Sequence, residues 1–528
     1  MLKKTNLLIL GLLISSIYNI VFAQSRVFKD VESSISTTVR TIMQDNHLMG
    51  YLLFTELEKI SADSFNYRIN ILDENLNDIG KIEFKDEKLI FYDLAFDGDI
   101  ICLGFLKSNF VGKTFTYNKE FKGIASKAKN SIYLQFLNLE GKIIKKIDKS
   151  VEINNKSFYN FSLKLQECEA SLPNGLQLTN LPQKGFACFY SDLKNNLLYN
   201  YSSTGEEVWL KKVANRNKFH LLTNNNKYLY LLSSEPLNNY NRTYSINGFD
   251  IADGKAHTPL DLVDEAGNTL RILNIQNDPV SNNLCISGNV FDEEADFSAE
   301  FVPDYTKSRL IGTFSTTING DKKNDIITKY NYWNNEALMP MISKNGRFEQ
   351  EKTYFTYNTS FLDHQGNTYF TGSKVIKKTR WGLITSSIIL APTLFMPLML
   401  AQYGVNKYQL TDAMLLKQNK NGELSIASTI PLTSTPGYWS RANPNPDIYI
   451  RSFTHLFDGN SKKDYLIIKD KIDYLIYNVT EQKVVKKIPR KESNYNYYGV
   501  YPAKEGHILI SEYNEKEKTR RLSIEMIQ

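Results

Sequence analysis

A short pattern recurs along most of this sequence: an apolar strand, a turn with a polar or acidic residue before Gly, a charged residue and a second strand. Copies include INILDENLNDIGKIEF, YLQFLNLEGKIIKKI and AMLLKQNKNGELSI. The turn glycines are Gly80, Gly141, Gly205, Gly254, Gly320 and Gly422, and a seventh copy, YLIYNVTEQKVVKKI, has Gln482 at this place. Because Gly tolerates the positive φ of tight turns, each copy predicts a β-hairpin, and Gln482 predicts a looser turn.

A second pattern precedes several of these hairpins. GDIICLG, NNLCISG and GNTYFTG, which end at Gly104, Gly288 and Gly372, each read as a turn, a short strand and a Gly. Each unit therefore supplies at least three strands and has room for a fourth. Four antiparallel strands repeated about seven times are typical of a β-propeller. Hairpins from two sandwich domains are the alternative.

We therefore predict an all-β chain, with residues 24–528 forming a single β-propeller domain of about seven blades, within a range of six to eight, each four-stranded and antiparallel. The last segment, from Ala503 to Gln528, has two interpretations. It adds an eighth blade, or it completes the first blade by pairing with N-terminal strands.

One unit resembles a known kind of repeat. GNTYFTGS, followed by DAMLLKQNKNGEL from Asp412 to Leu424, is similar to the units of secreted bacterial β-propeller repeat proteins, where a GN-hydrophobic-G strand precedes a DA-hydrophobic-K hairpin that ends at Gly. The similarity is partial around Gly104 and Gly288. It implies the propeller fold and export. It carries no catalytic residues over, because such repeats share blade geometry and not an activity.

The N-terminus has the layout of a signal peptide. Lys3 and Lys4 precede an apolar run, and small residues follow around Ala23. We predict that residues 1–23 are removed and that the mature protein is periplasmic, on the outer surface or secreted. The formal charge of +6 is spread thinly over the chain and indicates no nucleic-acid partner.

An uncharged stretch of 26 residues, from Trp381 to Asn406, interrupts one unit and is read as an insertion at about 377–410 inside one blade. It is long enough to cross a bilayer, but Pro392 and Pro397 would interrupt a helix, and a crossing would split the blade. A buried apolar segment, a docking patch and a membrane-dipping hairpin are the other interpretations. If 381–403 contacts a membrane or partner, the expected contact residues are Trp381, Leu383, Ile388, Leu394, Phe395 and Leu398.

Four cysteines in an exported chain permit two disulfides. Cys168 and Cys188, which flank a loop with Pro, Gly and Asn, are the one pair with an argument for it. Cys102 and Cys285 lie within apolar strand patterns and are expected to be buried thiols.

The sequence contains none of the common local motifs of metal, nucleotide or nucleophile sites. The six histidines are not spaced three or four residues apart, and the chain has no HExxH, CxxC, P-loop or GxSxG pattern. We therefore expect no metal and no cofactor. Whether the protein is an enzyme stays open, and the absence of these motifs favours a protein that is not one.

Three stretches concentrate rings beside polar groups: NYWNN, PGYWSRANPNPDIY and NYNYYGVY. Their expected ligand or partner residues are Trp333, Tyr438, Trp439, Arg441, Tyr497 and Tyr498. The leading hypothesis is an exported, non-catalytic propeller that binds an envelope protein or a glycan as a binding or scaffold protein. The alternative is a glycan-active enzyme at the channel mouth, with Asp447 near Trp439.

Overall fold

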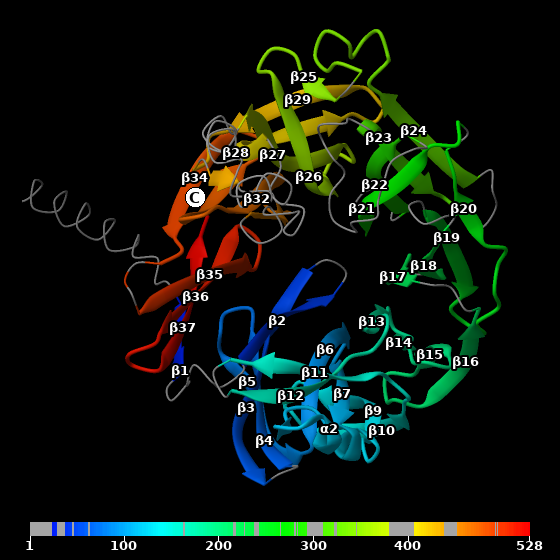
Figure 1. Ribbon diagram of the computed structural model, residues 1–528, viewed down its shortest axis with the longest axis vertical. Coiled ribbons are helices and arrows are strands. Elements are labelled where there is room, and N and C mark those ends of the chain that lie inside the picture. The colour runs from blue at the N-terminus through cyan, green and yellow to red at the C-terminus, as the bar shows by residue number, and fades with distance from the viewer. Residues whose placement is uncertain are drawn as a thin grey trace, which may run out of the picture.

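The computed structural model describes residues 24–28, 37–44, 47–61, 64–161, 164–214, 218–225, 227–236, 242–264, 266–278, 281, 283–292, 310–320, 325–344, 346–379, 406–433, 435–437, 451–491, 493 and 495–527. Strands dominate these residues. They form eight antiparallel sheets of four or more strands, arranged around a ring (Figure 1). The all-β propeller expected from the repeats is confirmed.

The first four sheets follow the chain from its N-terminal side. They are β2 (Thr37–Gln44), β3 (His47–Ser61), β4 (Ser64–Asp73) and β5 (Asp78–Asp86); β6 (Lys88–Asp97), β7 (Ile100–Ser108), β9 (Asn130–Asn138) and β10 (Ile143–Ser150); β13 (Leu176–Leu181), β14 (Gly185–Ser191), β15 (Asn196–Tyr201) and β16 (Glu207–Val213); and β17 (Lys218–Asn224), β18 (Tyr228–Pro236), β19 (Arg242–Asp250) and β20 (Leu260–Leu262).

The other four sheets complete the ring. They are β21 (Thr269–Asn277), β22 (Leu284–Phe291), β23 (Leu310–Ile318) and β24 (Ile326–Tyr332); β25 (Arg347–Phe348), β26 (Thr353–Leu362), β27 (Thr368–Thr379), β28 (Asn406–Gln418) and β29 (Leu424–Ile430), with β30 (Thr435–Gly437) beside β28; β31 (Ser452–Asp458), β32 (Lys463–Lys469), β33 (Asp473–Asn478) and β34 (Lys483–Pro489); and β35 (Asn496–Pro502), β36 (His507–Asn514), β37 (Thr519–Met526) and β1 (Gln24–Phe28).

Each sheet buries both of its faces against its neighbours. Eight clusters of buried apolar side chains each join two consecutive sheets, and the last joins the β35 sheet to the β2 sheet through residues such as Leu522 and Leu53. The first strands of successive sheets contact one another, as β2 does β6 and β21 does β26, so they line the centre of the ring. This packing explains why the central strands read as nearly continuous apolar runs.

The two ends of the chain close the ring together. β1 pairs antiparallel with β37, from Gln24 opposite Ile524 to Phe28 opposite Arg520. β1 is therefore the outer strand of the sheet that β35, β36 and β37 begin. Each interpretation of the last segment is therefore partly right. The segment belongs to an additional sheet, and the fourth strand of that sheet comes from the N-terminus.

The Gly that ends the second repeat pattern lies opposite a bulge. In the β27 sheet, Tyr357 pairs with Gly372 and Thr359 with Thr371, so β26 has one extra residue at this point. A Cβ on Gly372 would lie 1.7 Å from the carbonyl oxygen of Thr356. A Cβ on Gly288 would likewise lie 2.1 Å from the carbonyl oxygen of Arg271, and both Gly288 and Gly104 lie opposite a bulge in the first strand. The motif is thus explained by a first strand that kinks toward its neighbour.

Two of the turns need a separate account. Gln482 has φ of +53°, the left-handed conformation that glycine adopts in other copies, but its turn runs from Asn478 to Lys483 and is one residue longer than the turn from Asn138 to Lys142, so it is looser as expected. Gly80 lies inside β5, and the left-handed residue of that turn is Leu76, at φ +64°. A Cβ on Gly80 would lie 2.4 Å from the carbonyl oxygen of Leu139 in the next sheet, so close packing and not turn geometry requires this glycine.

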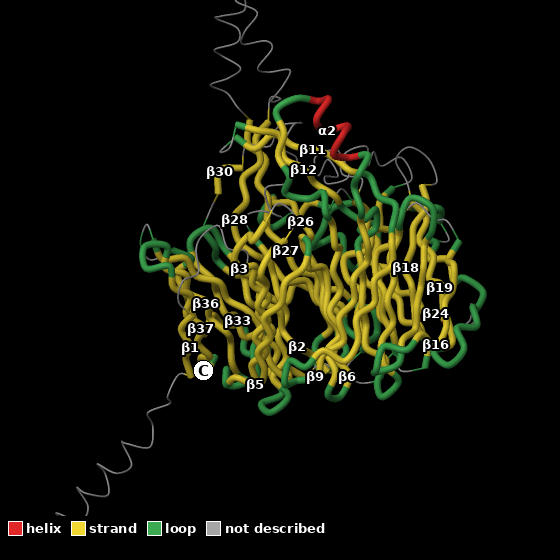
Figure 2. The backbone as a smooth tube through the Cα atoms, turned by 90° about the horizontal axis from the view of Figure 1, so that it is seen from below, coloured by secondary structure: helices red, strands yellow, loops and turns green. Residues whose placement is uncertain are grey.

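The two ends of the ring differ (Figure 2). Turns between first and second strands, and between third and fourth strands, are short and lie at one end, which we call the turn face. The opposite end, the insertion face, carries the longer connection between β7 and β9, and it is also the end at which β27 finishes and β28 begins. It also carries a cap made of β8 (Thr114–Phe115), α2 (Asn118–Ala125), β11 (Asn155–Asn160) and β12 (Leu165–Ala170).

Loss of the closing strand should loosen the ring. A mature chain that begins at Lys29 lacks β1 and leaves β37 as an unpaired edge, so we expect a melting temperature several degrees lower than that of the chain beginning at Gln24. The control is Arg26→Ala, which removes the ion pair of Arg26 with Asp78 and keeps the strand. Equal melting temperatures for the two chain lengths would show that β1 does not stabilise the closure.

Candidate functional site

A cavity of about 500 Å³ opens at the centre of the turn face. Its lining comes from five of the eight sheets, at the ends of first strands and in the turns that follow them. The residues that line it include Thr41, Met43, His47, Leu48, Gln276, Asn277, Leu362, His364, His455, Leu456, Phe457, Asp464, Pro502, Ala503 and Glu505. Three of the six histidines of the chain therefore meet in one place.

The centre of the site is a carboxylate held between two histidines. Nδ1 of His364 lies 2.5 Å from Oδ2 of Asp464, and Nε2 of His455 lies 2.9 Å from Oδ1. The backbone N–H of His364 also donates to Oδ2, at 3.3 Å. Because His364 precedes β27 and the other two residues belong to the next sheet, the cluster also ties two sheets together.

Burial and hydrogen bonding act in opposite directions on this carboxylate. The Asp464 side chain is 2 % exposed. This burial raises its pKa, but the hydrogen bonds from His455 and His364, together with the electrostatic attraction of His455, outweigh it, so the pKa of Asp464 is lowered from its ordinary value of 3.8. An ionised carboxylate only accepts hydrogen bonds, so each histidine donates a ring N–H to it.

The remaining ring nitrogens are the reactive part of the arrangement. In a neutral imidazole whose one nitrogen donates, the other carries a lone pair and accepts. Asp464 thus fixes the orientation of Nε2 of His364 and Nδ1 of His455 as acceptors. The two histidine side chains are 21 % and 22 % exposed, which leaves both rings accessible from the cavity.

Aromatic rings hold the histidines and line the cavity. His455 stacks on Phe361 with ring centroids 4.2 Å apart, and His364 stacks on Phe457 with centroids 5.7 Å apart. Phe361 is buried, whereas Phe457 is 41 % exposed and itself lines the cavity. The site therefore combines an accessible ring face with fixed hydrogen-bond acceptors.

A second pair of titratable groups lies at the rim. Nδ1 of His47 is 3.6 Å from Oε1 of Glu505, and their side chains are 70 % and 34 % exposed. This contact joins the first and last sheets of the ring. Within the described residues, no group of three or more His, Cys, Asp or Glu side chains is placed to hold a metal ion.

The sequence-predicted ligand residues lie elsewhere. Trp333 is 1 % exposed and packs with Leu310 and Phe348 in a core cluster, so its ring has a structural role and no face for a ligand. Tyr497 is 41 % exposed on β35, and the hydroxyl of Tyr498 donates to Glu512 at 3.3 Å. Tyr438, Trp439 and Arg441 lie outside the described residues, as do Asp447 and the apolar contact residues Trp381, Leu383, Ile388, Leu394, Phe395 and Leu398.

The cysteines are unpaired in this structure. Cys168 and Cys188, the pair considered for a disulfide, are both free and buried in the cluster between the β6 and β13 sheets and the cap. Burial raises the pKa of both thiols, that of Cys168 to about 11. Their residues serve as small apolar packing groups, which is the role expected for Cys102.

The His–Asp–His cluster was missed by the search of the sequence because its members are far apart along the chain. His364 and Asp464 are separated by 100 residues. The available signal was positional, since His364, His455 and His47 each lie beside a turn between the first and second strands of a unit. Superposing the repeats would have placed all three at the same end of the ring.

The fold defines the protein as a β-propeller. A family model covers residues 1–441, so the chain belongs to the family of unknown function DUF6770. No curated protein matches the chain. None of the helices in the described ranges is long and apolar enough to cross a membrane.

Solved structures show weak overall similarity. The chain is similar to the WD40 domain of SCAP from fission yeast, with a TM-score of 0.39, 9 % identity and coverage of 95 % of this chain and 98 % of that one. Kuenenia stuttgartiensis hydrazine synthase is similar with a TM-score of 0.34 and 11 % identity, over 75 % of this chain and 97 % of that one. The Cps50 (Swd1) β-propeller domain of Myceliophteria thermophila is similar with a TM-score of 0.33 and 8 % identity, over 79 % of this chain and 98 % of that one. With TM-scores this low, these similarities say nothing about ligand or activity.

The stability of the cluster should depend on pH in a defined direction. Because the folded pKa of Asp464 is lowered, its ionised form stabilises the fold above pH 3.8, and this stabilisation is lost as the pH falls through the lowered value. We expect Asp464→Asn to cost about 1–3 kcal/mol at neutral pH. The difference in unfolding free energy between this variant and the wild type should become smaller at acidic pH. Urea unfolding at several pH values measures it.

The control is Glu481→Gln, which removes an exposed carboxylate whose pKa is also lowered, by hydrogen bonds with Lys463 and Lys483. An exposed pair contributes little, so this variant should unfold like the wild type. A loss in Asp464→Asn that stays constant down to the lowest pH would contradict the assignment.

Proposed function

We propose that this protein is an exported, non-catalytic binding propeller of the bacterial cell envelope, and that the cavity on the turn face binds a glycan. The observation that carries the proposal is the buried Asp464, which fixes two histidine nitrogens as acceptors at a cavity lined from five sheets. A concave site with a few convergent polar groups is the usual form of a small-molecule site.

The chemistry of the cavity favours a polyhydroxyl ligand. Hydroxyl groups donate to lone pairs such as those left on His364 and His455, and they also pair with the amides of Gln276 and Asn277. The exposed face of Phe457 offers apolar contact for the C–H face of a sugar ring. A neutral oligosaccharide satisfies both requirements.

The same geometry argues against the enzyme alternative. A glycosidase needs one carboxylic acid that donates a proton and a second carboxylate across the bond. Asp464 and Glu505 both line the cavity, but both oxygens of Asp464 already accept hydrogen bonds, and its pKa is lowered. A carboxylate in this state is a poor proton donor, which supports binding without hydrolysis.

Glycan binding is tested directly with chitin oligosaccharides and maltooligosaccharides, first on an immobilised panel and then by titration calorimetry. We expect Phe457→Ser to weaken binding about fivefold, since a ring contact contributes about 1 kcal/mol. Tyr495→Ser, at a ring that is 53 % exposed and away from the cavity, should bind as the wild type does. New reducing ends released on incubation would favour the enzyme, and equal loss in both variants would overturn the site.

Export is the other half of the proposal. It is supported by Lys3 and Lys4 before the apolar run and by the position of β1, whose first residue, Gln24, directly follows the expected cleavage site. Mass spectrometry of the protein from the native host should find a mature chain that starts at Gln24. Protein found in the cytoplasm with residues 1–23 intact would contradict export.

A further inference from the structure

The cap on the insertion face exposes aromatic rings. Phe161 is 84 % exposed and Tyr117 is 68 % exposed, which makes them the two most exposed large apolar side chains in the described residues. Phe158 and Tyr159 on β11 are 45 % and 51 % exposed. The rings of Tyr159 and Phe161 contact each other edge to face, with centroids 5.0 Å apart. A soluble surface seldom presents such a group without a contact to make.

The same cap is rich in exposed lysines. Six of them are exposed and form no ion pair within the described residues: Lys119, Lys122, Lys127, Lys129, Lys156 and Lys164. Some lysines of the ring, such as Lys145, Lys149 and Lys486, instead pair with a glutamate. The positive charge of the cap is therefore available to an anionic partner.

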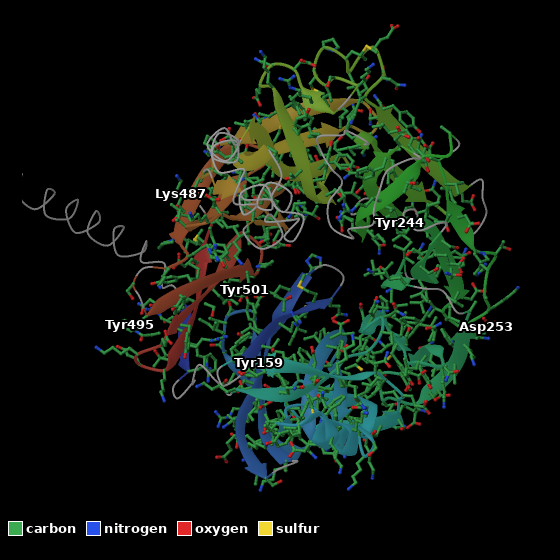
Figure 3. The ribbon with its side chains drawn as sticks, in the orientation of Figure 1. Tyr159, Tyr244, Asp253, Lys487, Tyr495 and Tyr501 are labelled. Carbon is green, nitrogen blue, oxygen red and sulfur yellow. The ribbon has the colours of Figure 1, made fainter. Side chains whose placement is uncertain are left out.

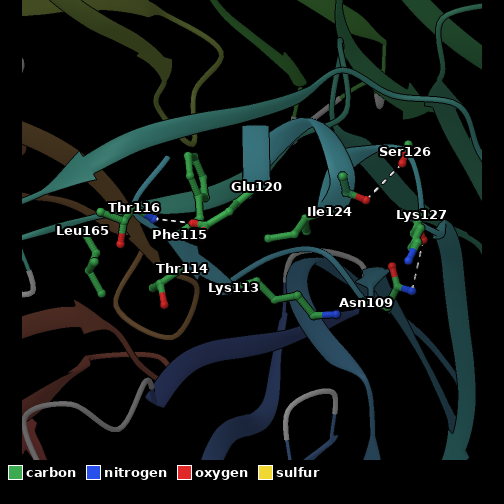
Figure 4. A pocket seen from close by; sticks show the side chains of 11 residues that line it. Asn109, Lys113, Thr114, Phe115, Thr116, Glu120, Ile124, Ser126, Lys127 and Leu165 are labelled. Atoms are coloured by element: carbon green, nitrogen blue, oxygen red, sulfur yellow. Dashed lines mark hydrogen bonds between the residues drawn. The ribbon is translucent and has the colours of Figure 1, made fainter. Parts of the chain in front are cut away.

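A groove in the cap adds polar groups to the charge. It has a volume of about 840 Å³ and is lined by Lys113, Lys127, Asn109 and the hydroxyls of Thr114 and Thr116 among others (Figure 4). The Glu120 carboxylate at its edge accepts the backbone N–H of Thr116, so the acidic group is used within the cap. The groove suits a phosphate headgroup with its glycerol hydroxyls.

We propose that the cap docks on the surface of a lipid bilayer that contains anionic lipid. Rings such as Tyr117 and Phe161 enter the interface, and the lysines bind the headgroups, which is the division of roles that peripheral membrane surfaces use. The cap protrudes at the end of the ring from which β27 and β28 also extend (Figure 2). The turn face and its cavity then point away from the membrane.

The first test is co-sedimentation of the full mature chain with vesicles of phosphatidylcholine alone or with phosphatidylglycerol. We expect binding to the anionic vesicles, weakened by high sodium chloride. Lys119→Glu with Lys122→Glu should reduce it by about tenfold or more, since each lysine near an anionic surface contributes about fivefold. Lys85→Glu with Lys142→Glu, at exposed lysines outside the cap, should leave binding unchanged.

The aromatic half of the surface has its own variants. Phe161→Ser with Tyr117→Ser should weaken vesicle binding, whereas Tyr495→Ser, at an exposed ring outside the cap, should not. Figure 3 labels Tyr159 of the cap and Tyr495 at the outer rim of the ring. Circular dichroism and melting temperature confirm that the surface variants fold.

The proposal is overturned by equal binding to neutral and anionic vesicles, by equal loss in cap and control variants, or by loss only when residues 381–403 are deleted. Loss only in the deletion would assign membrane contact to the apolar segment. Binding of an acidic protein without vesicle binding would assign the cap to a protein partner. Oligosaccharide binding at the cavity of the turn face is measured without lipid, so failure of either proposal is recognised separately.

Discussion

Both faces of every sheet in this protein must be covered, and that requirement governs the rest of the structure. A twisted four-stranded sheet with two apolar faces needs a neighbour on each side, so a row of such sheets leaves two bare faces unless it closes. Here the cluster that contains Leu53 and Leu522 joins the last sheet to the first. Pairing of β1 with β37 then completes the last sheet and couples the two ends of the chain.

Closure of the ring also brings the first strands close together at its centre, and this close packing accounts for several residues of the sequence. Some of the first strands carry a bulge, and Gly288 and Gly372 lie opposite two of these bulges, where a Cβ would meet the backbone of the bulged strand. At the turn face, side chains bind the backbone of the neighbouring sheet: Asp97 accepts the N–H of Gly185, and the amide of Asn277 donates to the carbonyl of Asn224. These contacts hold the turns of adjacent sheets in register, and Asp464 with His364 belongs to the same set.

The repeats predicted the hairpins, the second strands and the all-β class because those features depend on local patterns of alternation and glycine. They left the closing sheet undecided between an eighth blade and pairing with N-terminal strands, because its strands come from opposite ends of the chain. Local patterns also failed for function. Trp333 stands among polar residues in the sequence but is buried by packing from other strands, whereas His364 and His455 lie in unremarkable contexts and meet only through Asp464. A site assembled across sheets leaves no spacing signature.

The difference between the two faces follows from the same geometry. On the turn face, hairpins are short and bound to their neighbours, so side chains there keep fixed positions, and a cavity with oriented acceptors such as His455 can form. On the other face, connections leave the sheets and grow without disturbing the packed strands, as the cap does between β7 and β9 and after β10. A rigid ligand cavity and an extended docking surface therefore arise at opposite ends of one ring, and each can change in sequence without altering the other.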